Sequence, residues 1–510
     1  MHVFLAYIRD DNFYHLLPEK IRRRTPDNGR VKVMAFPPLG IQTLAPVLRR
    51  HGHRVQMFDS CHPQMKAADI AQAARKNRPD LIALSSLSTT TYPAVKATAN
   101  RLKIEAPDIP IILGGVFPSM NPVHILRDCP DIDCIGVGEG EELLPEYLDH
   151  LADPGAVAGL VWRKNGDIIQ NDRRPLIQDL DRFPYPDRSS LPIDYVESLP
   201  MDVPAVLSLD RFCTMQTSRG CPYNCSYCNI SVLFGGKWRH RSAEHVLGEM
   251  QELSDQGYRS IYFTDDHFLL NRKRINAICT GIINRNLKFH WGCEGRVDSV
   301  AIDQFPIMKK AGCFALSFGI ESGTQKVLDL LNKKQSLDEI EHAVKQAKRS
   351  GISRIHGFFL IGSPNETEPD VMASFRFAAK LQIDTFNFNR LCVYRGTPLW
   401  KEYVGRGIID DDADWSKWFK CSDIDPTVLP SEALNSMRMK GYLYLFVRRI
   451  FCRPIQTMKL VRAFSRNMEW SDIFRLLASP FKKRTMFHKP DLPEKMIALG
   501  IDQPIREHLN

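Results

Sequence analysis

The stretch Cys221-Pro222-Tyr223-Asn224-Cys225-Ser226-Tyr227-Cys228, preceded by Ser218-Arg219-Gly220, carries three thiols within eight residues. It follows directly on a short apolar run, Cys213–Thr217, which predicts a β-strand. Thiolates are soft ligands that suit zinc or iron–sulfur clusters. Because a structural zinc site and a four-iron cluster each normally take four protein ligands, three local Cys favour a cluster with one open iron. A zinc knuckle completed by His240 or by a distant Cys is the alternative.

Strand and helix signals alternate along the chain from this point. The predicted strands are Cys213–Thr217, Ser260–Thr264, Lys288–Cys293, Phe314–Phe318, Arg354–Leu360 and Thr385–Val393. The predicted helices between them are Glu244–Gln256, Asn271–Arg285, Ile302–Ala311, Leu337–Arg349 and Asp370–Leu381. Six strands with five intervening helices predict a partial, open β/α barrel, with the chemistry at the carboxyl ends of its strands.

The first 150 residues show the same alternation with shorter strands. Apolar runs at Val31–Ala35, Val55–Phe58, Leu81–Ser85, Ile111–Leu113 and Cys134–Val137 are separated by helical patterns at Thr43–His51, Ala67–Lys76, Tyr92–Ile104, Pro122–Arg127 and Glu141–Leu151. This order predicts an α/β fold with a doubly wound parallel sheet, whose ligands bind at the carboxyl ends of the strands.

Four parts are expected from this pattern. They are an amino-terminal sheet domain at 1–150, a linker at 151–204, the barrel at 205–420 and a basic helical segment at 421–510. Length agrees, because 510 residues correspond to about three domains.

Composition is that of an ordinary globular chain, with 44% hydrophobic and 25% charged residues. No secretory signal and no apolar run of about 18 residues is found. An odd count of 13 Cys, scattered outside the one tight group, argues against a secreted disulfide framework. A cytoplasmic location is therefore expected.

The net charge of +9 comes from one segment, because Arg438–Lys489 holds thirteen Lys or Arg and two Asp or Glu. Helices are predicted at Met437–Ile450 and Ile455–Phe464, where apolar runs alternate with basic residues. The segment would be either a peripheral helix on an anionic membrane or a lid helix with a solvated basic face, and the second interpretation is favoured. No nucleic-acid partner is expected, because the segment has a helical pattern.

The cysteine group resembles the cluster loop of the radical S-adenosylmethionine superfamily. Further matches follow in the family's order over residues 213–400. They are His240–Glu244, Phe263–Phe268, Gly292–Asp298, Phe318–Gly323, Gly357–Thr367 and Tyr394–Leu399. Each match alone is weak, but six in the right order after a correctly spaced loop are specific.

The resemblance implies that Cys221, Cys225 and Cys228 bind a 4Fe–4S cluster whose open iron takes S-adenosylmethionine. It also implies contacts with that cofactor: Tyr227 near adenine, Asp265 and Asp266 at the methionine amine, Arg296 at its carboxylate, Glu321 at the ribose, and Gly357 and Gly362 at the adenine. The alternative for each charged residue is a solvated loop residue or a helix cap. One of the two aspartates is expected to face away, because neighbouring strand residues alternate.

Residues 31–150 resemble the cobalamin-binding domain that precedes many such barrels. Matching residues follow successive predicted strands: Pro38, Gly40, Ser85, Ser86, Thr89, Gly114, Gly115, Phe117, Gly138, Glu139 and Gly140. The Asp-x-His-x-x-Gly motif that supplies a lower corrin ligand in some relatives is absent from this region, so that ligand is not assigned. A ligand-free flavodoxin-like domain is the alternative.

The resemblance implies an enzyme that cleaves S-adenosylmethionine to a 5′-deoxyadenosyl radical and methylates an unactivated carbon of a small or amphiphilic substrate. An external one-electron reductant, a flavodoxin or a ferredoxin, would be its partner. One alternative is a cobalamin-dependent reaction without methyl transfer, as in the anaerobic magnesium-protoporphyrin ester cyclases. Another is a non-catalytic corrin- or cluster-binding sensor.

Overall fold

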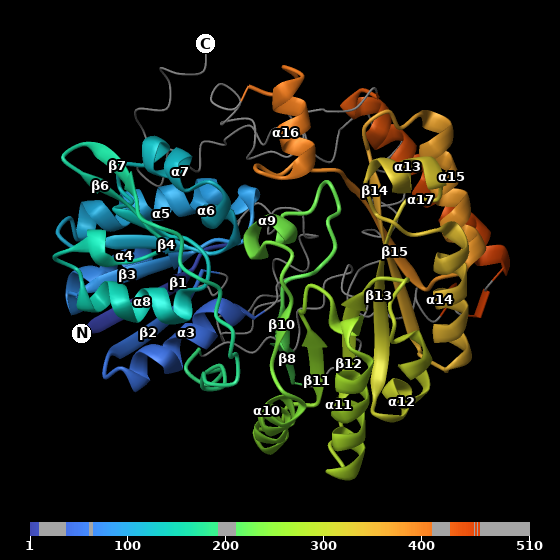
Figure 1. Cartoon of the computed structure of the whole chain (residues 1–510), viewed down its shortest axis with the longest axis horizontal. Helices are drawn as coiled ribbons and strands as arrows, with labels where there is room; N and C mark the ends of the chain where they lie inside the picture. The colour runs from blue at the N-terminus through green and yellow to red at the C-terminus, as the bar shows by residue number, and fades with distance from the viewer. Residues whose placement is uncertain are drawn as a thin grey trace. The chain divides into compact units, whose positions relative to one another are not determined.

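The computed structural model describes residues 1–9, 37–60, 65–191, 211–410, 429–452, 454–455 and 457–458. The chain forms two compact units, Met1–Arg448 and Arg449–Asn510. The first unit contains both large sheets, drawn in blue to teal and in green to orange in Figure 1.

The amino-terminal sheet has seven strands in the order β2-β1-β3-β4-β5-β6-β7. Five of them are parallel: β1 (His2–Tyr7), β2 (Arg54–Asp59), β3 (Leu81–Ser85), β4 (Ile111–Gly114) and β5 (Cys134–Gly136). The predictions for β2 to β5 are confirmed, whereas β1 was not predicted as a strand. The run Val31–Ala35 lies outside the described residues.

Helices cover both faces of this sheet, as Figure 1 shows. Along β1, Val3 and Leu5 pack with α3 (Leu39–Arg50) and α8 (Gly140–Asp149). Phe4 and Ala6 point the other way, toward α4 (Ala67–Asn77), α5 (Tyr92–Glu105) and α7 (Pro122–Asp128). Apolar side chains therefore point to both faces of the strand, and the predicted doubly wound architecture is confirmed.

The second sheet has six parallel strands in the order β15-β14-β13-β12-β11-β8. They are β8 (Phe212–Met215), β11 (Ser260–Phe263), β12 (His290–Gly295), β13 (Cys313–Glu321), β14 (Arg354–Ile361) and β15 (Thr385–Arg390). The helices between them are α10 (Ala243–Asp255), α11 (Arg272–Asn284), α12 (Phe305–Lys310), α13 (Gln325–Leu330), α14 (Leu337–Arg349) and α15 (Glu368–Leu381). Within the described chain β8 and β15 are the two edges, so the predicted partial, open barrel is confirmed.

Several short elements were not predicted from the sequence. Strands β6 (Leu160–Lys164) and β7 (Asp167–Gln170) form an antiparallel hairpin on β5, inside the stretch that was expected to be a linker. Strand β9 (Ser218–Arg219), helix α9 (Ile230–Phe234) and strand β10 (Arg239–His240) frame the cysteine loop. The elements β9, α9 and β10 are too short to show a hydrophobic period. In β6 and β7 the apolar residues are mixed with charged ones, so neither forms an apolar run.

Helix α17 (Ser431–Cys452) confirms the predicted helix at Met437–Ile450. Its Leu434, Met437 and Leu445 belong to the hydrophobic core of the barrel. A Cβ at Gly441 would lie 2.2 Å from the ring of Phe375, so only glycine allows this close approach. Most of the second predicted helix, Ile455–Phe464, lies outside the described residues. Among the helices described, none combines the length and the apolar character needed to cross a bilayer.

The barrel interior contains a fully buried histidine, His356 on β14. Its Nδ1 lies 2.8 Å from the Thr385 hydroxyl, and its Nε2 has no hydrogen-bond partner among the described residues. Burial lowers the pKa of His356 to about 3. The folded protein therefore holds this ring neutral where the unfolded chain would protonate it.

We expect acid to destabilise the fold through this residue. In the unfolded chain the His356 ring takes up a proton below about pH 6.5, whereas in the folded protein it stays neutral. The free energy of unfolding therefore falls by about 1.4 kcal/mol as the pH drops from about 7.5 to 5.5. His356→Asn should reduce that loss, measured as the shift in thermal unfolding temperature between the two pH values. The same substitution at the exposed His290 should leave the shift unchanged, and an unchanged shift in His356→Asn would contradict the assignment.

Candidate active site

The three cysteines lie on the loop that leaves the sheet after β8 and β9. Gly220, just before Cys221, has φ +85°, and a Cβ there would lie 2.0 Å from the Lys237 carbonyl oxygen. Its backbone N–H donates to Asp266 Oδ2 at 2.7 Å. The loop therefore starts from a position that only glycine can fill, tied to the end of the neighbouring strand β11.

The donor set fits an iron–sulfur cluster. Cys225 is buried, while Cys221 and Cys228 are partly exposed. Burial raises the pKa of the Cys228 thiol to about 11, so iron must displace its proton on binding. In the described part of the chain, no three His, Cys, Asp or Glu side chains converge on a single-ion position. A 4Fe–4S cluster needs no such convergence, because three of its irons take one thiolate each and the fourth stays open, whereas a zinc knuckle does need it.

Arg296 lies against this loop. Its Nη1 is 3.4 Å from Cys225 Sγ, and its guanidinium sits 3.8 Å from the centre of the Tyr223 ring. Asp298 accepts two further hydrogen bonds from it, both at 2.9 Å, and the Lys333 carbonyl oxygen accepts another. Most of its donors are thus engaged within the protein, and its role toward a methionine carboxylate stays a prediction.

Glu321 pairs with a lysine that was not predicted from the sequence. Lys333 Nζ lies 2.8 Å from Glu321 Oε1 and 3.4 Å from the Tyr227 hydroxyl. Burial alone would lower the pKa of Lys333, but the Glu321 carboxylate raises it above its usual value. The ammonium therefore stays charged and links Glu321 to the cluster loop. No periodic signal marks Lys333, because it lies in a loop after α13.

The two aspartates after β11 point in different directions. Asp265 accepts hydrogen bonds from Thr217 N at 2.6 Å, Thr217 Oγ1 at 2.5 Å and Ser218 Oγ at 2.6 Å. It thereby joins the ends of β8 and β11 and has little capacity left for a ligand. Asp266 faces the cluster loop instead, and burial raises its pKa to about 6. Of the pair, Asp266 keeps more acceptor capacity at the cluster loop, and its contact with the methionine amine stays a prediction.

The predicted adenine contacts, Gly357 and Gly362, have local structural reasons to be glycine. A Cβ at Gly357 would lie 2.7 Å from Ile383 Cδ1, within the packed core. Gly362 has φ +84°, and its N–H donates to Glu366 Oε2 at 2.7 Å. Neither observation bears on adenine, so that role stays a prediction.

Glu294 belongs to a sequence motif that assigned it no role. It lies on β12, and its side chain points to the face opposite Trp291 and Cys293, which pack in the helix-covered core. The Tyr262 hydroxyl donates to Glu294 Oε1 at 2.8 Å and is 3.1 Å from Ser317 Oγ. Burial raises the pKa of Glu294 to about 7, so it can hold or release a proton near neutrality. Strand alternation counted back from Arg296 would have identified it.

Most of the predicted cobalamin contacts follow the carboxyl ends of β3, β4 and β5, whereas Pro38 and Gly40 stand at the start of α3. Some of them mainly pack against one another. A Cβ at Gly115 would lie 2.3 Å from the Ser86 carbonyl oxygen, and the Ser86 hydroxyl lies 2.6 Å from Thr91 Oγ1. Gly138 has φ +95°, and a Cβ there would meet no described atom within 4 Å, so this residue leaves open space at the same edge.

A cavity joins this edge to the barrel. Thr89 and Phe117 line it from the sheet domain, Asn229 from the cluster loop, and Tyr394 and Arg395 from the segment after β15. A second cavity of about 300 Å³ shares Arg395 and two further lining residues, Met120 and Asn121. Of the predicted contacts, the remaining members line neither cavity: Pro38, Gly40, Ser85, Ser86, Gly114, Gly115, Gly138, Glu139 and Gly140.

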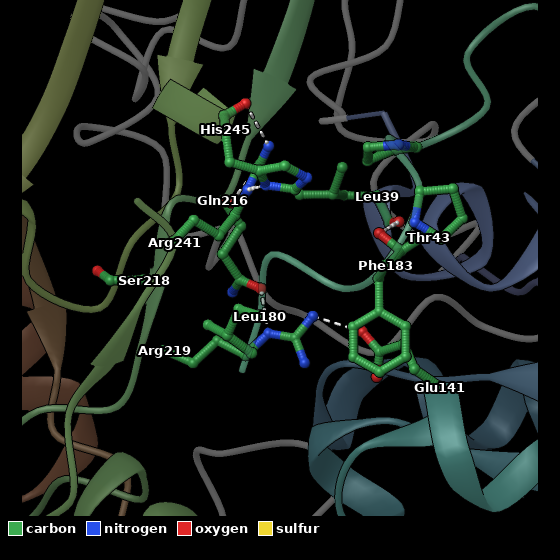
Figure 2. Close-up of a pocket in the computed structure, with 12 residues that line it drawn as sticks. Leu39, Thr43, Glu141, Leu180, Phe183, Gln216, Ser218, Arg219, Arg241 and His245 are labelled. Carbon is green, nitrogen blue, oxygen red and sulfur yellow. Dashed lines mark hydrogen bonds and ion pairs between the residues drawn. The ribbon is translucent and has the colours of Figure 1, made fainter. Parts of the chain in front are cut away.

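Glu139 reaches the barrel. Its carboxylate binds Arg219 and Arg239, on either side of the cysteine loop, and neighbouring Glu141 binds Arg219. Figure 2 shows Arg219 extended toward Glu141, beside a cavity of about 40 Å³. That cavity has room for a few waters and none for a cofactor.

Comparisons with known proteins agree with this geometry. Residues 215–378 match the family model of the radical SAM superfamily, and residues 31–148 match that of the B12 binding domain. An uncharacterized methyltransferase of Pyrococcus horikoshii is 32% identical over 82% of this chain and 90% of its own length. An anaerobic magnesium-protoporphyrin IX monomethyl ester cyclase of Rubrivivax gelatinosus is 25% identical over 82% of this chain and 75% of its own.

A solved structure shares the fold. The radical S-adenosylmethionine methyltransferase TsrM from Kitasatospora setae, with cobalamin and a 4Fe–4S cluster bound, superposes with a TM-score of 0.64 at 17% identity. The match covers 79% of this chain and 75% of that one.

A three-cysteine loop at the mouth of a partial barrel, joined to a doubly wound domain, defines a radical S-adenosylmethionine enzyme. More narrowly, the chain belongs to the cobalamin-dependent members of this superfamily, which include methyltransferases and the magnesium-protoporphyrin cyclases. Its cofactors are a 4Fe–4S cluster, S-adenosylmethionine and cobalamin.

Gly220→Ala should disrupt the cluster loop. The new Cβ would collide with the Lys237 carbonyl oxygen, in addition to the cost of about 1–2 kcal/mol for a left-handed alanine. We expect the variant to lose most of its iron after anaerobic reconstitution, measured as iron per chain. Gly236→Ala is the matched control, because Gly236 also has positive φ but no described atom within 4 Å of its Cβ position. Equal iron in both variants would contradict the steric argument.

Proposed function

We propose that the protein transfers a methyl group from S-adenosylmethionine, by way of cobalamin, to an unactivated carbon of a small or amphiphilic molecule. The similarity to the methyltransferase of Pyrococcus horikoshii, which extends over 90% of that protein, supports methyl transfer. An external one-electron reductant, a flavodoxin or a ferredoxin, completes the proposed reaction.

One observation carries the proposal. A single cavity is lined both by the carboxyl edge of the cobalamin-type domain, at Thr89 and Phe117, and by Asn229 of the cluster loop. The cavity, of about 20 Å³, marks the junction of the two domains and is itself too small for a substrate. A substrate admitted at this junction would be reached by both cofactors. In such enzymes the cluster and S-adenosylmethionine supply a carbon-centred radical, and cobalamin supplies the methyl group.

The residues around the cluster have distinct tasks in this proposal. Arg296 and Lys333 put two positive charges beside the cluster loop, which favours the negatively charged thiolates. Asp266 offers a carboxylate for the methionine ammonium. Glu294, which accepts a hydrogen bond from the Tyr262 hydroxyl, would hold or release a proton inside the barrel.

The radical step is tested through Cys225. Reconstituted wild-type protein should cleave S-adenosylmethionine to 5′-deoxyadenosine under dithionite, and Cys225→Ala should abolish this, because the cluster would lose one of its three thiolates. Cys279→Ala, which removes a buried core thiol away from the loop, is the matched control and should retain cleavage. The product is quantified by chromatography; no 5′-deoxyadenosine from the wild type would refute the proposal.

Methyl transfer needs a separate measurement. With cobalamin and the true substrate present, S-adenosylhomocysteine should accumulate together with 5′-deoxyadenosine. If 5′-deoxyadenosine formed without S-adenosylhomocysteine, the result would favour a cyclisation or another radical reaction over methylation, as the cyclase relative suggests. A chain that binds corrin and cluster but cleaves nothing would be a sensor.

A peripheral membrane contact through the basic segment belongs to the same proposal. On α17, Leu443 and Val447 are 46% and 43% exposed and lie one helical turn apart. Arg448 follows directly, within the segment that carries thirteen basic residues. An apolar strip beside positive charge is the pattern of a helix that binds an anionic bilayer, which would suit an amphiphilic substrate.

Vesicle sedimentation tests this contact. The wild type should bind vesicles of phosphatidylglycerol and phosphatidylcholine more strongly than vesicles of phosphatidylcholine alone, and salt should weaken the binding. The double variant Leu443→Asp, Val447→Asp should bind several-fold less, because it removes apolar contact and adds negative charge. Ile104→Asp, at an apolar side chain of α5 that is 65% exposed, is the control. Equal binding by all three proteins would favour the lid helix instead.

A further inference from the structure

One carboxylate of the amino-terminal domain contacts both ends of the cysteine loop. Glu139 lies between β5 and α8 of that domain. Arg219, on β9, is the second residue before Cys221, and Arg239, on β10, follows the loop and helix α9. The two arginines lie opposite each other in the β9–β10 pair. The segment that carries all three cysteines therefore begins and ends at residues that Glu139 holds.

The contacts are short and buried. Arg219 Nη1 lies 2.8 Å from Glu139 Oε1, and Arg239 Nη1 lies 2.7 Å from Glu139 Oε2. The same Oε2 accepts from the Ile177 N–H at 2.9 Å, and Arg239 Nη1 donates to the Ile177 carbonyl oxygen at 2.6 Å. The side chains of Glu139 and Arg239 are 6% and 5% exposed, so water competes little for them.

Glu141 adds a second carboxylate to Arg219. Burial would raise the pKa of Glu141, but the Arg219 guanidinium lowers it below its usual value. The group is therefore charged throughout the physiological range. Loss of one partner from such a buried network leaves a buried charge without its counter-ion, which is strongly destabilising. The network therefore favours the one arrangement in which every charge is paired.

The network leads straight to the cluster loop. Arg219 is followed by Gly220, whose N–H is fixed by Asp266 at 2.7 Å, and then by Cys221. A shift of the Arg219 side chain would move the first cysteine, and a shift of Arg239 would move the strand at which the loop returns. Any effect of the two arginines on the cluster would therefore be exerted through the backbone.

We propose that Glu139, with Arg219 and Arg239, is a positioning network through which the amino-terminal domain fixes both ends of the cluster loop. Cluster assembly and S-adenosylmethionine binding then depend on this domain, independently of cobalamin. The role replaces the cobalamin contact that the sequence resemblance suggested for Glu139. It does not depend on which reaction the enzyme performs on its substrate.

The test compares Glu139→Gln with Glu142→Gln in the full-length protein. Glu142, three residues along on α8, pairs with Arg174 and Arg182 outside the barrel and is the matched control. Three quantities are measured after anaerobic reconstitution: iron per chain, the change in the electron paramagnetic resonance spectrum of the reduced cluster on adding S-adenosylmethionine, and the affinity for hydroxocobalamin.

Glu139→Gln should lower the iron content. The S-adenosylmethionine concentration that gives half of the spectral change should rise about tenfold, the scale seen for residues that orient metal ligands. Its affinity for hydroxocobalamin should equal that of the wild type, and Glu142→Gln should resemble the wild type throughout. A normal cluster with lost hydroxocobalamin binding would overturn the proposal in favour of a corrin contact. A wild-type result in all three measurements would overturn it too.

A milder variant covers the case in which Glu139→Gln does not fold. Arg219→Lys keeps the charge but loses the fork that reaches Glu139 and Glu141 at once. It should show the same spectral defect at unchanged hydroxocobalamin affinity, and a wild-type spectrum would refute the proposal. Since no measurement needs a methyl acceptor, failure here is distinct from failure of the proposed methyl transfer.

Discussion

The backbone N–H of Gly220, held by Asp266, fixes the point at which the cluster loop leaves the sheet. The geometry of the cluster follows from that point, because the three thiols must reach one inorganic core from a single short loop. The left-handed φ of Gly220 turns the chain there, and the Lys237 carbonyl oxygen leaves no room for a side chain. Parallel strands then bring Asp266, Arg296 and Glu321 to the same end of the barrel.

Charge at this end of the barrel is balanced in pairs rather than left free. Arg296 is bound to Asp298, Lys333 to Glu321, and Arg219 to the carboxylates of the amino-terminal domain. Such pairs hold the side chains in one geometry. This suits a site in which a reactive intermediate must not react with the surrounding side chains. Glu294 differs, because its only described partner is a phenol, and it therefore keeps a proton available near neutrality.

The sequence was sufficient for elements long enough to show a period and for motifs that follow strands in order. All six barrel strands and the cluster loop were predicted in this way. It was not sufficient for β1, which precedes the residues that were assigned to the first strand, or for β6 and β7, whose apolar residues are mixed with charged ones. It was not sufficient for Lys333 either, which lies in a loop. Contacts between domains, such as Glu139 with Arg239, leave no trace in a single chain, because the partners are 100 residues apart. The Gly-Glu-Gly-Glu motif gave no sign of the ion pairs that Glu139 makes, and its corrin contact stays a prediction.

Helix α17 has a consequence for dissecting the protein. Its Tyr442 accepts a hydrogen bond from the Phe388 backbone N–H at 2.9 Å, beside Phe375 and Phe388, which stack with ring centres 3.9 Å apart. A fragment that stopped at residue 420, where the barrel motifs have already ended, would expose these rings to water. The exposed apolar surface would promote aggregation. Soluble expression of the catalytic half would thus require a chain that runs through the end of α17, even though no motif marks it.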